Sequence, residues 1–331
     1  MYKDIYSFCK VKNAGICFKN GEEPTPRVKF LMKMCEREGL EYELDVWSNE
    51  KDTEGLNILD AAYAMDMVDD KELKNEISDL YTDFLDLGRQ YLENNGISQY
   101  PDELEPELVK SLGPEYQEIL DRYTNQLKKI IQSQKANNFF NIILRGGSDK
   151  FVTAHHDIVN PNSDNANDNS CSVINALAIK KLRPEVNVVL LDGEEVGGIG
   201  STRLSERIKN GDFKCKWILN LELTGKGGRN FFVGDLGTEL TTWIQNRFEC
   251  PLVKVPLNDA VIFKKFGINS TVINPLPFTE KAGPIVTKDG RYLDYQMLFN
   301  CHRMADSVET IDPDDMKEFV EEVCLKIIDE A

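Results

Sequence analysis

Four short motifs of histidine, carboxylate and amide residues follow one another between residues 151 and 223. They are His155-His156-Asp157, Asn167-Asp168-Asn169, Gly193-Glu194-Glu195 and Asn220-Leu221-Glu222. The chain holds only three histidines, and the third, His302, comes much later, shortly before Asp306. Imidazole combined with several carboxylates is a ligand set that holds a divalent metal such as zinc when the metal activates water. The spacing therefore predicts a catalytic metal centre.

The first motif favours one of its two histidines as a ligand. In an extended chain, His155 and Asp157 point to the same side, whereas His156 points away. Asp157 can then fix the tautomer of the His155 imidazole by accepting a hydrogen bond from it. We therefore predict that His155 is a metal ligand and that His156 is structural.

Asp168 has two interpretations. The segment 171–181 is predicted to be helical, so Asp168 could simply cap the start of that helix. A carboxylate between two asparagines could equally bridge two metal ions. A loop of a site can lead into a helix, so the residues alone leave both interpretations open.

Glu194 and Glu195 follow a buried apolar strand. Adjacent carboxylates at such a position repel each other and need a cation or a raised pKa. A metal ion answers this need, because one carboxylate can bind it while the other transfers a proton. A phosphate-binding loop is not indicated, since Gly227 stands where a hydroxyl residue should follow Lys226.

The strands and helices predict an α/β fold with a doubly wound, mostly parallel central sheet flanked by helices. Expected strands cover 42–47, 139–144, 150–154, 186–191, 217–221, 231–233 and 270–273, and expected helices include 26–39 and a terminal helix from Asp312-Pro313 to about 329. Ligands bind beyond the carboxyl ends of the strands in such sheets. His155, Glu194, Glu195 and Glu222 all lie at or just after predicted strand ends.

An acidic segment over 56–138 interrupts this pattern. Apolar residues recur at helical spacing in two stretches, separated by breakers between Gly96 and Pro101, which predicts a helical hairpin. The catalytic domain is then formed by 1–55 and 139–331. Simple packing on the domain, an active-site lid and an arm for a homo-oligomer are all compatible with the insertion.

Composition narrows the class of protein. The chain of 331 residues has 39 basic and 56 acidic residues, a net charge of −17. Such a surface disfavours binding to nucleic acid or to anionic lipid. The first residues lack the apolar run of a signal peptide, and no later run is long enough for a membrane span, so we expect a soluble, cytoplasmic protein. The eight cysteines form no Cys-x-x-Cys pair, which favours free thiols.

The order of the motifs resembles that of the co-catalytic di-zinc exopeptidases of metallopeptidase family 28, which include leucyl-type aminopeptidases and glutamate carboxypeptidases. The resemblance covers roughly residues 139–330 and ends on His302 with Asp306-Ser307. It implies that His155 and Glu222 hold one zinc ion, that Glu195 and His302 hold a second, and that Asp168 bridges them. Asp157 would support His155, and Glu194 would be the general base while a zinc-bound hydroxide attacks a peptide carbonyl.

Two positions depart from the family pattern. Glu222 stands where many relatives have aspartate, and Cys301-His302-Arg303 stands where Tyr-His-Thr is common.

Taken as a whole, the motif set and the resemblance favour a terminal peptidase, first of all an aminopeptidase. A carboxypeptidase that grips a substrate carboxylate through Lys288, Arg291 or Arg303, a small-molecule amidohydrolase and a one-zinc enzyme like glutaminyl cyclase remain alternatives. A non-enzymatic scaffold is disfavoured because the whole ligand set is present.

Overall fold

The computed structural model describes residues 1–11, 23–49, 137–158, 163–195 and 197–331, together with scattered residues between 72 and 125. The helical hairpin expected over 56–138 therefore lies almost entirely outside the described residues. The scattered residues are helical, and Arg122 forms an ion pair with Glu76. The hairpin and its role as lid or arm stay predictions.

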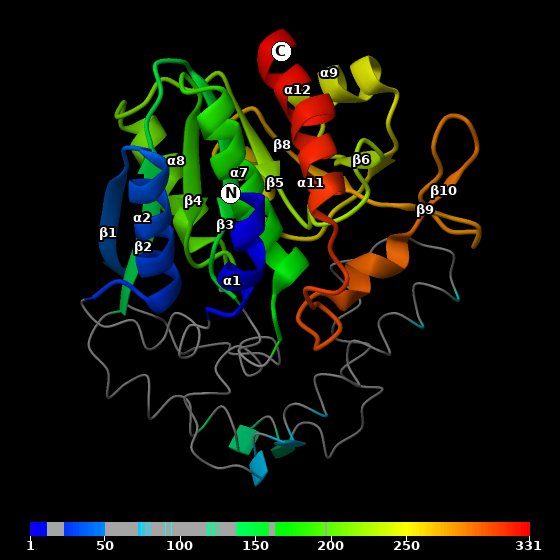
Figure 1. Cartoon of the computed structure of the whole chain (residues 1–331), viewed down its shortest axis with the longest axis horizontal. Helices are drawn as coiled ribbons and strands as arrows, with labels where there is room; N and C mark the ends of the chain where they lie inside the picture. Colours follow the sequence, from blue (N-terminus) through cyan, green and yellow to red (C-terminus); the bar gives the residue numbers. More distant parts are fainter. Residues whose placement is uncertain are drawn as a thin grey trace.

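An eight-stranded sheet lies at the centre of the molecule, in the order β1-β2-β4-β3-β5-β8-β6-β7 (Figure 1). The strands are β1 (Glu43–Asn49), β2 (Asn137–Leu144), β3 (Lys150–His155), β4 (Asn187–Leu191), β5 (Trp217–Leu221), β6 (Phe231–Gly234), β7 (Leu252–Val253) and β8 (Ser270–Pro275). The central strands β4, β3, β5 and β8 run parallel, whereas β1, β2 and β6 are each joined to the sheet by antiparallel pairing. This confirms the predicted mostly parallel sheet.

Helices cover both faces of this sheet, as a doubly wound fold requires. One face carries α1 (Ile5–Cys9), α2 (Pro26–Glu38), α7 (Cys171–Leu182), α9 (Glu239–Phe248), α11 (Pro313–Phe319) and α12 (Leu325–Glu330), and the other carries α8 (Ile199–Lys209) and α10 (Asp259–Lys265). In Figure 1, α2, α7, α11 and α12 lie over the face turned toward the viewer. None of the helices in the described ranges has the length and apolar character needed to cross a bilayer.

Short turns and a small hairpin complete the described structure. They are the single turns η1 (Tyr2–Asp4) and η4 (Tyr295–Asn300), the widened turns η3 (Ala166–Ser170) and η5 (Val320–Cys324), and the hairpin of β9 (Phe278–Thr279) and β10 (Tyr292–Leu293). The terminal helix predicted from the Asp312-Pro313 cap is thus α11 and α12 joined by η5.

The buried strands feed two separate cores. In β4, Val188 and Leu190 pack into the larger core beneath α2 and α7, whereas Val189 and Leu191 pack against Leu204 of α8 on the other face. A strand covered on both faces must be apolar on both sides. This explains the uninterrupted apolar run that the sequence shows there.

Helix ends follow the capping signals in the sequence. The Thr25 hydroxyl accepts a hydrogen bond from the Val28 N–H at 3.3 Å, and α2 stops before Gly39, which adopts a φ of 67°. At the other end of the chain, the Asp312 carboxylate accepts hydrogen bonds from the N–H groups of Asp314 and Asp315 at the start of α11. Both predicted helix starts are confirmed.

The glycine run after Glu222 serves packing. The Gly227 N–H donates to the Asp315 carboxylate of α11 at 2.8 Å, and the Asp312 N–H donates to the Gly225 carbonyl at 2.7 Å. A Cβ atom on Gly227 would lie only 2.4 Å from the Leu276 backbone nitrogen. Glycine is needed there because this loop runs directly against the chain beyond β8.

Candidate metal centre

The predicted site residues gather at the carboxyl ends of the parallel strands. His155 is the last residue of β3, Glu194 and Glu195 lie in the turn after β4, and Glu222 directly follows β5. Parallel strands bring their carboxyl ends to one edge of a sheet, where ligands bind in this kind of fold. Asp168 and His302 join them from the turn η3 and from the loop after η4.

Asp168 lies between two histidines. Its Oδ1 is 3.3 Å from Nε2 of His155, and its Oδ2 is 3.2 Å from Nε2 of His302. Glu222 Oε2 lies 3.5 Å from the same nitrogen of His155, and Glu195 Oε2 lies 3.2 Å from that of His302. The structure thus forms two sets of three potential ligands, which share Asp168.

Asp168 does not cap the following helix. Helix α7 begins at Cys171, and the preceding residue, Ser170, makes no side-chain capping bond to it. Asp168 lies inside the widened turn η3, where its backbone leaves the helical conformation and its peptide bond to Asn169 is cis. Helix capping by Asp168 is thus not observed, and the carboxylate lies between His155 and His302 instead.

The two sets fit zinc. Tetrahedral zinc holds nitrogen and oxygen ligands at about 2.0–2.1 Å, which places neighbouring ligand atoms about 3.3 Å apart. The nitrogen–oxygen distances of 3.2–3.5 Å in the two sets match this edge. Glu195 Oε1 is also buried and has no hydrogen-bond partner in the part of the chain that the structure describes, which is costly unless a cation lies nearby. Glu194 belongs to the same cluster, because it, His155 and Glu195 also have ligand atoms within 4.8 Å of one another.

The charges of the cluster call for a cation. Burial raises the pKa of Glu194 well above its ordinary value and that of Glu195 to about 7. Burial disfavours the charged form of His155, but the carboxylates of Glu222, Asp157 and Asp168 outweigh this and raise its pKa well above the usual range. Without a metal ion, a proton supplies the positive charge that the carboxylates attract.

Asp157 links the histidine to the pair of glutamates. Its Oδ1 lies 3.3 Å from Nδ1 of His155, which leaves Nε2 facing Asp168. The two oxygens of Asp157 also accept hydrogen bonds from the N–H groups of Glu194 and Glu195, at 3.3 and 3.1 Å. One buried carboxylate therefore orients the imidazole and holds the turn after β4.

His156 points away from the centre, as the alternation along a strand predicts. Its Nε2 lies 2.8 Å from the Phe140 carbonyl oxygen of β2. Burial lowers the pKa of His156 to about 4, so its ring is neutral at physiological pH. It contributes no atom to the two ligand sets described above.

Two asparagines orient Glu222, a role that sequence reasoning missed. Asn169 Nδ2 donates to Oε2 of Glu222 at 2.8 Å, and Asn220 Nδ2 donates to Oε1 at 3.0 Å. The Thr153 hydroxyl in turn donates to Oδ1 of Asn220 at 2.7 Å. The asparagines close to acidic residues in both motifs were the sequence signal that could have indicated these two hydrogen bonds to Glu222.

Asp306 ties the His302 loop to the Asp168 turn. Its buried carboxylate accepts hydrogen bonds from the N–H groups of Asn167 and Asp168, at 2.7 and 3.0 Å. His302 itself adopts a left-handed conformation with a φ of 63°, which costs a residue other than glycine roughly 1–2 kcal/mol. The packing of the loop must offset this cost to keep the imidazole beside Asp168.

Asp259 is a further acidic residue near the centre that carried no sequence signal. It is the first residue of α10 and its side chain is fully buried, and among the described residues neither of its carboxylate oxygens has a hydrogen-bond partner. Burial raises the pKa of Asp259 to about 7. The positive charge of His155 lowers this pKa, whereas the negative charge of Glu222 raises it further. This position adds to the excess of negative charge around the two ligand sets.

Replacing Asp259 by asparagine is expected to stabilise the metal-free protein at alkaline pH. Since the folded pKa is raised from 3.8 to about 7, the folded protein holds a proton that the unfolded chain has released, and stability falls as pH rises through this window. Asp259→Asn removes this loss, so its free energy of unfolding at pH 8 should exceed that of wild type by about 2–4 kcal/mol. Urea unfolding of the metal-free proteins at pH 5 and 8 measures it.

The gain in free energy of unfolding should shrink at pH 5, where the buried carboxyl of the wild type is protonated. Asp235→Asn, at an exposed position, should leave the free energy of unfolding unchanged at both pH values. An equal gain at both pH values would contradict the assignment of the effect to ionisation of Asp259.

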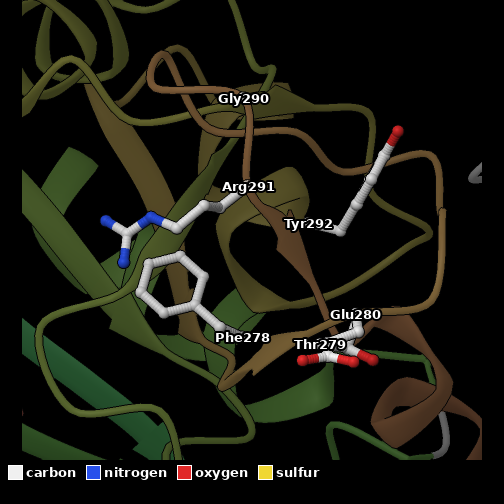
Figure 2. A pocket seen from close by; sticks show the side chains of 6 residues that line it. All are labelled: Phe278, Thr279, Glu280, Gly290, Arg291 and Tyr292. Atoms are coloured by element: carbon white, nitrogen blue, oxygen red, sulfur yellow. The ribbon is translucent and has the colours of Figure 1, made fainter.

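Of the three cations considered for a substrate carboxylate, Arg303 directly follows the candidate ligand His302, whereas Arg291 and Lys288 lie on the β9–β10 hairpin. Arg291 lines a surface pocket on the β9–β10 hairpin, stacks 3.7 Å from the ring centroid of Phe278 and pairs with Asp289 at 2.7 Å (Figure 2). Lys288 forms an ion pair with Glu249. Both are exposed surface cations with acidic partners of their own, which gives no support to a carboxypeptidase.

Comparison with known proteins identifies the family. The model of peptidase family M28 matches residues 141–327, more than half of the chain. The chain therefore belongs to peptidase family M28. This confirms the family that the order of the motifs resembles. Curated protein sequences gave no match.

Solved structures that are similar to this chain include enzymes of two kinds. A zinc aminopeptidase from Bacillus subtilis is 17% identical with a TM-score of 0.43, and the match covers 60% of this chain and 52% of that protein. The chain thus spans about half the length of that aminopeptidase. A Zn-dependent exopeptidase from Parabacteroides distasonis is 16% identical, with 60% and 80% covered and a TM-score of 0.44. The glutaminyl cyclase of Porphyromonas gingivalis is 13% identical, with 100% and 99% covered and a TM-score of 0.55, which supports the α/β fold of the described residues.

Proposed function

We propose that this protein is a zinc-dependent enzyme that hydrolyses the peptide bond at the amino end of a chain. The observation that carries the proposal is Asp168, which turns one carboxylate oxygen toward His155 and the other toward His302. One zinc ion would be held by His155, Asp168 and Glu222, and a second by Asp168, Glu195 and His302. Zinc at these positions would act as a Lewis acid: it would polarise the scissile carbonyl and lower the pKa of the attacking water.

Glu194 would act as the general base. It lies in the same cluster as His155 and Glu195, and burial raises its pKa, which makes its carboxylate a stronger base. In hydrolysis it would take the proton of the attacking water and deliver it to the leaving amine. Asp157 would keep His155 and the glutamate turn in place while the proton moves.

The acidic character of the centre favours a substrate with a positively charged terminus. Besides the ligands themselves, Glu194 and the buried Asp259 add carboxyl groups that bring further negative charge to the centre when they are ionised. A free α-ammonium group is attracted to such a site, whereas a terminal carboxylate is repelled by it. This supports an aminopeptidase over a carboxypeptidase.

Cyclisation of an amino-terminal glutamine is the second candidate. The observation that favours it is the fold match to the Porphyromonas gingivalis glutaminyl cyclase, which extends over the whole chain, whereas the match to the zinc aminopeptidase covers 60% of it. Both candidate reactions act on a free amino terminus, and they differ in their products. Hydrolysis releases an amino acid, while cyclisation releases ammonia and leaves the peptide bond intact.

Removing the metal is expected to abolish either activity. Dialysis against a chelator should lower turnover of aminoacyl p-nitroanilides at least about 10³-fold, because the metal supplies several kcal/mol of transition-state stabilisation, and added zinc should restore it. Zinc content per chain and turnover are followed together as zinc is returned. We expect two zinc ions per chain at full activity.

Peptides beginning with glutamine separate the two candidate reactions by mass spectrometry of the products. N-acetylated versions of the same substrates serve as controls and should be inert, since they lack the terminal ammonium group. A zinc-loaded protein that neither hydrolyses nor cyclises any free amino terminus would contradict the proposal. The cytoplasmic location and the homo-oligomer expected from the sequence stay predictions.

A further inference from the structure

Arg27, in the first turn of α2, has a fully buried side chain behind the candidate metal centre. Its Nε donates to the His156 carbonyl at 2.7 Å, Nη2 donates to the Ser170 hydroxyl at 2.9 Å, and Nη1 donates to the Val11 carbonyl at 3.2 Å. The guanidinium also stacks 4.0 Å from the centroid of the Phe8 ring in α1. Arginine is almost never fully buried unless its hydrogen-bonding capacity is met, and here several acceptors meet it.

These contacts join two of the three segments that carry the first set of ligands, the end of β3 and the turn η3. The His156 carbonyl directly follows His155 at the end of β3, and Ser170 lies two residues after Asp168 in the turn η3. A guanidinium is a planar, rigid fork, so its donors hold the acceptors at a defined separation. A single side chain of α2 therefore sets how far the end of β3 lies from the turn η3.

The same side chain also places a fixed positive charge next to the acidic cluster. Burial lowers the pKa of Arg27 to about 10, while the negative charge of Asp157 raises it, so the guanidinium stays protonated at neutral pH. Helix α1 covers this charge through Phe8, and residues 1–11 and α2 lie before the region 141–327 that defines the family.

We propose that Arg27 is a positioning residue of the metal centre, which holds the end of β3 and the turn η3 at the separation that zinc requires. The first two helices of the chain then belong to the support of the site. This inference rests on the proposed metal centre. It predicts that Arg27 governs zinc affinity, beyond its share in the stability of the fold.

The test compares Arg27→Met and Arg27→Lys with wild type. Zinc affinity is measured by competition with a chromophoric chelator, and the visible absorption spectrum of the cobalt-substituted protein reports the ligand geometry. Arg27→Met is expected to weaken zinc binding by about 10–100-fold, the usual effect of removing a group that orients metal ligands, and to alter the cobalt spectrum. Arg27→Lys, which keeps the charge and loses the fork, should recover part of the affinity.

Lys180→Met is the matched control. Lys180 of α7 is also a buried cation, and its ammonium group donates to the carbonyls of Arg145, Pro184 and Val186 at 2.6–2.9 Å. These contacts lie before β4, at the end of the sheet opposite the metal centre. This variant should lose stability like Arg27→Met but keep the zinc affinity and the cobalt spectrum of wild type.

Ser170→Ala keeps the inference testable should Arg27→Met fail to fold, because it removes only one of the links. It should weaken zinc binding toward the lower end of the same range. A folded Arg27→Met, or in its place Ser170→Ala, that binds zinc within about twofold of wild type and shows an unchanged cobalt spectrum would overturn the inference. A wild-type protein that binds no zinc at all would instead show that the proposed metal centre is wrong.

Discussion

Replacing Glu194 by glutamine is expected to lower kcat by about 10²–10⁴-fold, the usual contribution of a general base, without loss of zinc. Glutamine keeps the shape of the side chain but cannot accept a proton. The five proposed ligands, His155, Asp168, Glu195, Glu222 and His302, are untouched by this change. Turnover at saturating substrate and zinc content per chain are measured on the same preparation.

The zinc measurement decides between two roles for Glu194. It belongs to a group with His155 and Glu195 whose ligand atoms lie within 4.8 Å, so geometry would also allow it to bind metal. A variant that loses zinc in parallel with activity would make Glu194 a ligand, and a loss of less than about tenfold in kcat would argue against a general base. Glu280→Gln, at an exposed position on the β9–β10 hairpin, is the control and should keep wild-type kcat.

Replacing Asp168 by asparagine is expected to be the most damaging change at the metal centre. Asp168 is the one residue shared by both ligand sets, with an oxygen 3.3 Å from His155 and another 3.2 Å from His302. The asparagine side chain has lost the charge and one of the two ligand oxygens. We expect zinc content to fall from two ions to at most one, and activity to fall by at least about 10³-fold, which corresponds to about 4 kcal/mol.

Asp164→Asn is the matched control for this change. Asp164 lies on the same stretch of chain, where it pairs with Lys10 at 3.0 Å and accepts a hydrogen bond from the Val308 N–H. Its substitution should leave zinc content and turnover close to wild type. A protein with Asp168→Asn that still binds two zinc ions and keeps more than a tenth of its activity would rule out the bridging role.

The strand ends that carry the site could be read from the sequence. An apolar strand buried on both faces stops where polar residues begin, so the positions of His155, Glu194, Glu195 and Glu222 after such strands were visible. Because parallel strands place their carboxyl ends at one edge, these residues could be predicted to meet. The same reasoning located His156 on the opposite side of β3, where it contacts the Phe140 carbonyl.

The sequence offered Asp168 and His302 as candidates, but only the resemblance to a family brought the two together in one site. Nothing in the local sequence places His302 beside Asp168, because the loop after η4 is irregular and is held there by Asp306, whose carboxylate accepts hydrogen bonds from the N–H groups of Asn167 and Asp168. Asp259 gave no signal either, since an acidic residue at the start of a helix normally stabilises the helix end.

Arg27 shows the same limit in a helix that was predicted correctly. The Thr25-Pro26 start of α2 is confirmed, yet an arginine in its first turn reads as an ordinary surface cation. It is buried because α1 packs over it and because its acceptor, the His156 carbonyl, lies 129 residues further along the chain. Local patterns carry no information about a contact of this range.

The residue types and their order determined the chemistry of this protein, because imidazole and carboxylate groups at strand ends suit a divalent metal whatever surrounds them. The division of the ligands into two sets around Asp168 was implied only by the resemblance to a family. Tertiary structure alone gives the distances within the two sets, the groups that orient the ligands and the contacts of α1 and α2 behind the site. Distances of 3.2–3.5 Å between residues up to 134 positions apart depend on how strands, turns and helices pack together. That packing is a property of the whole fold.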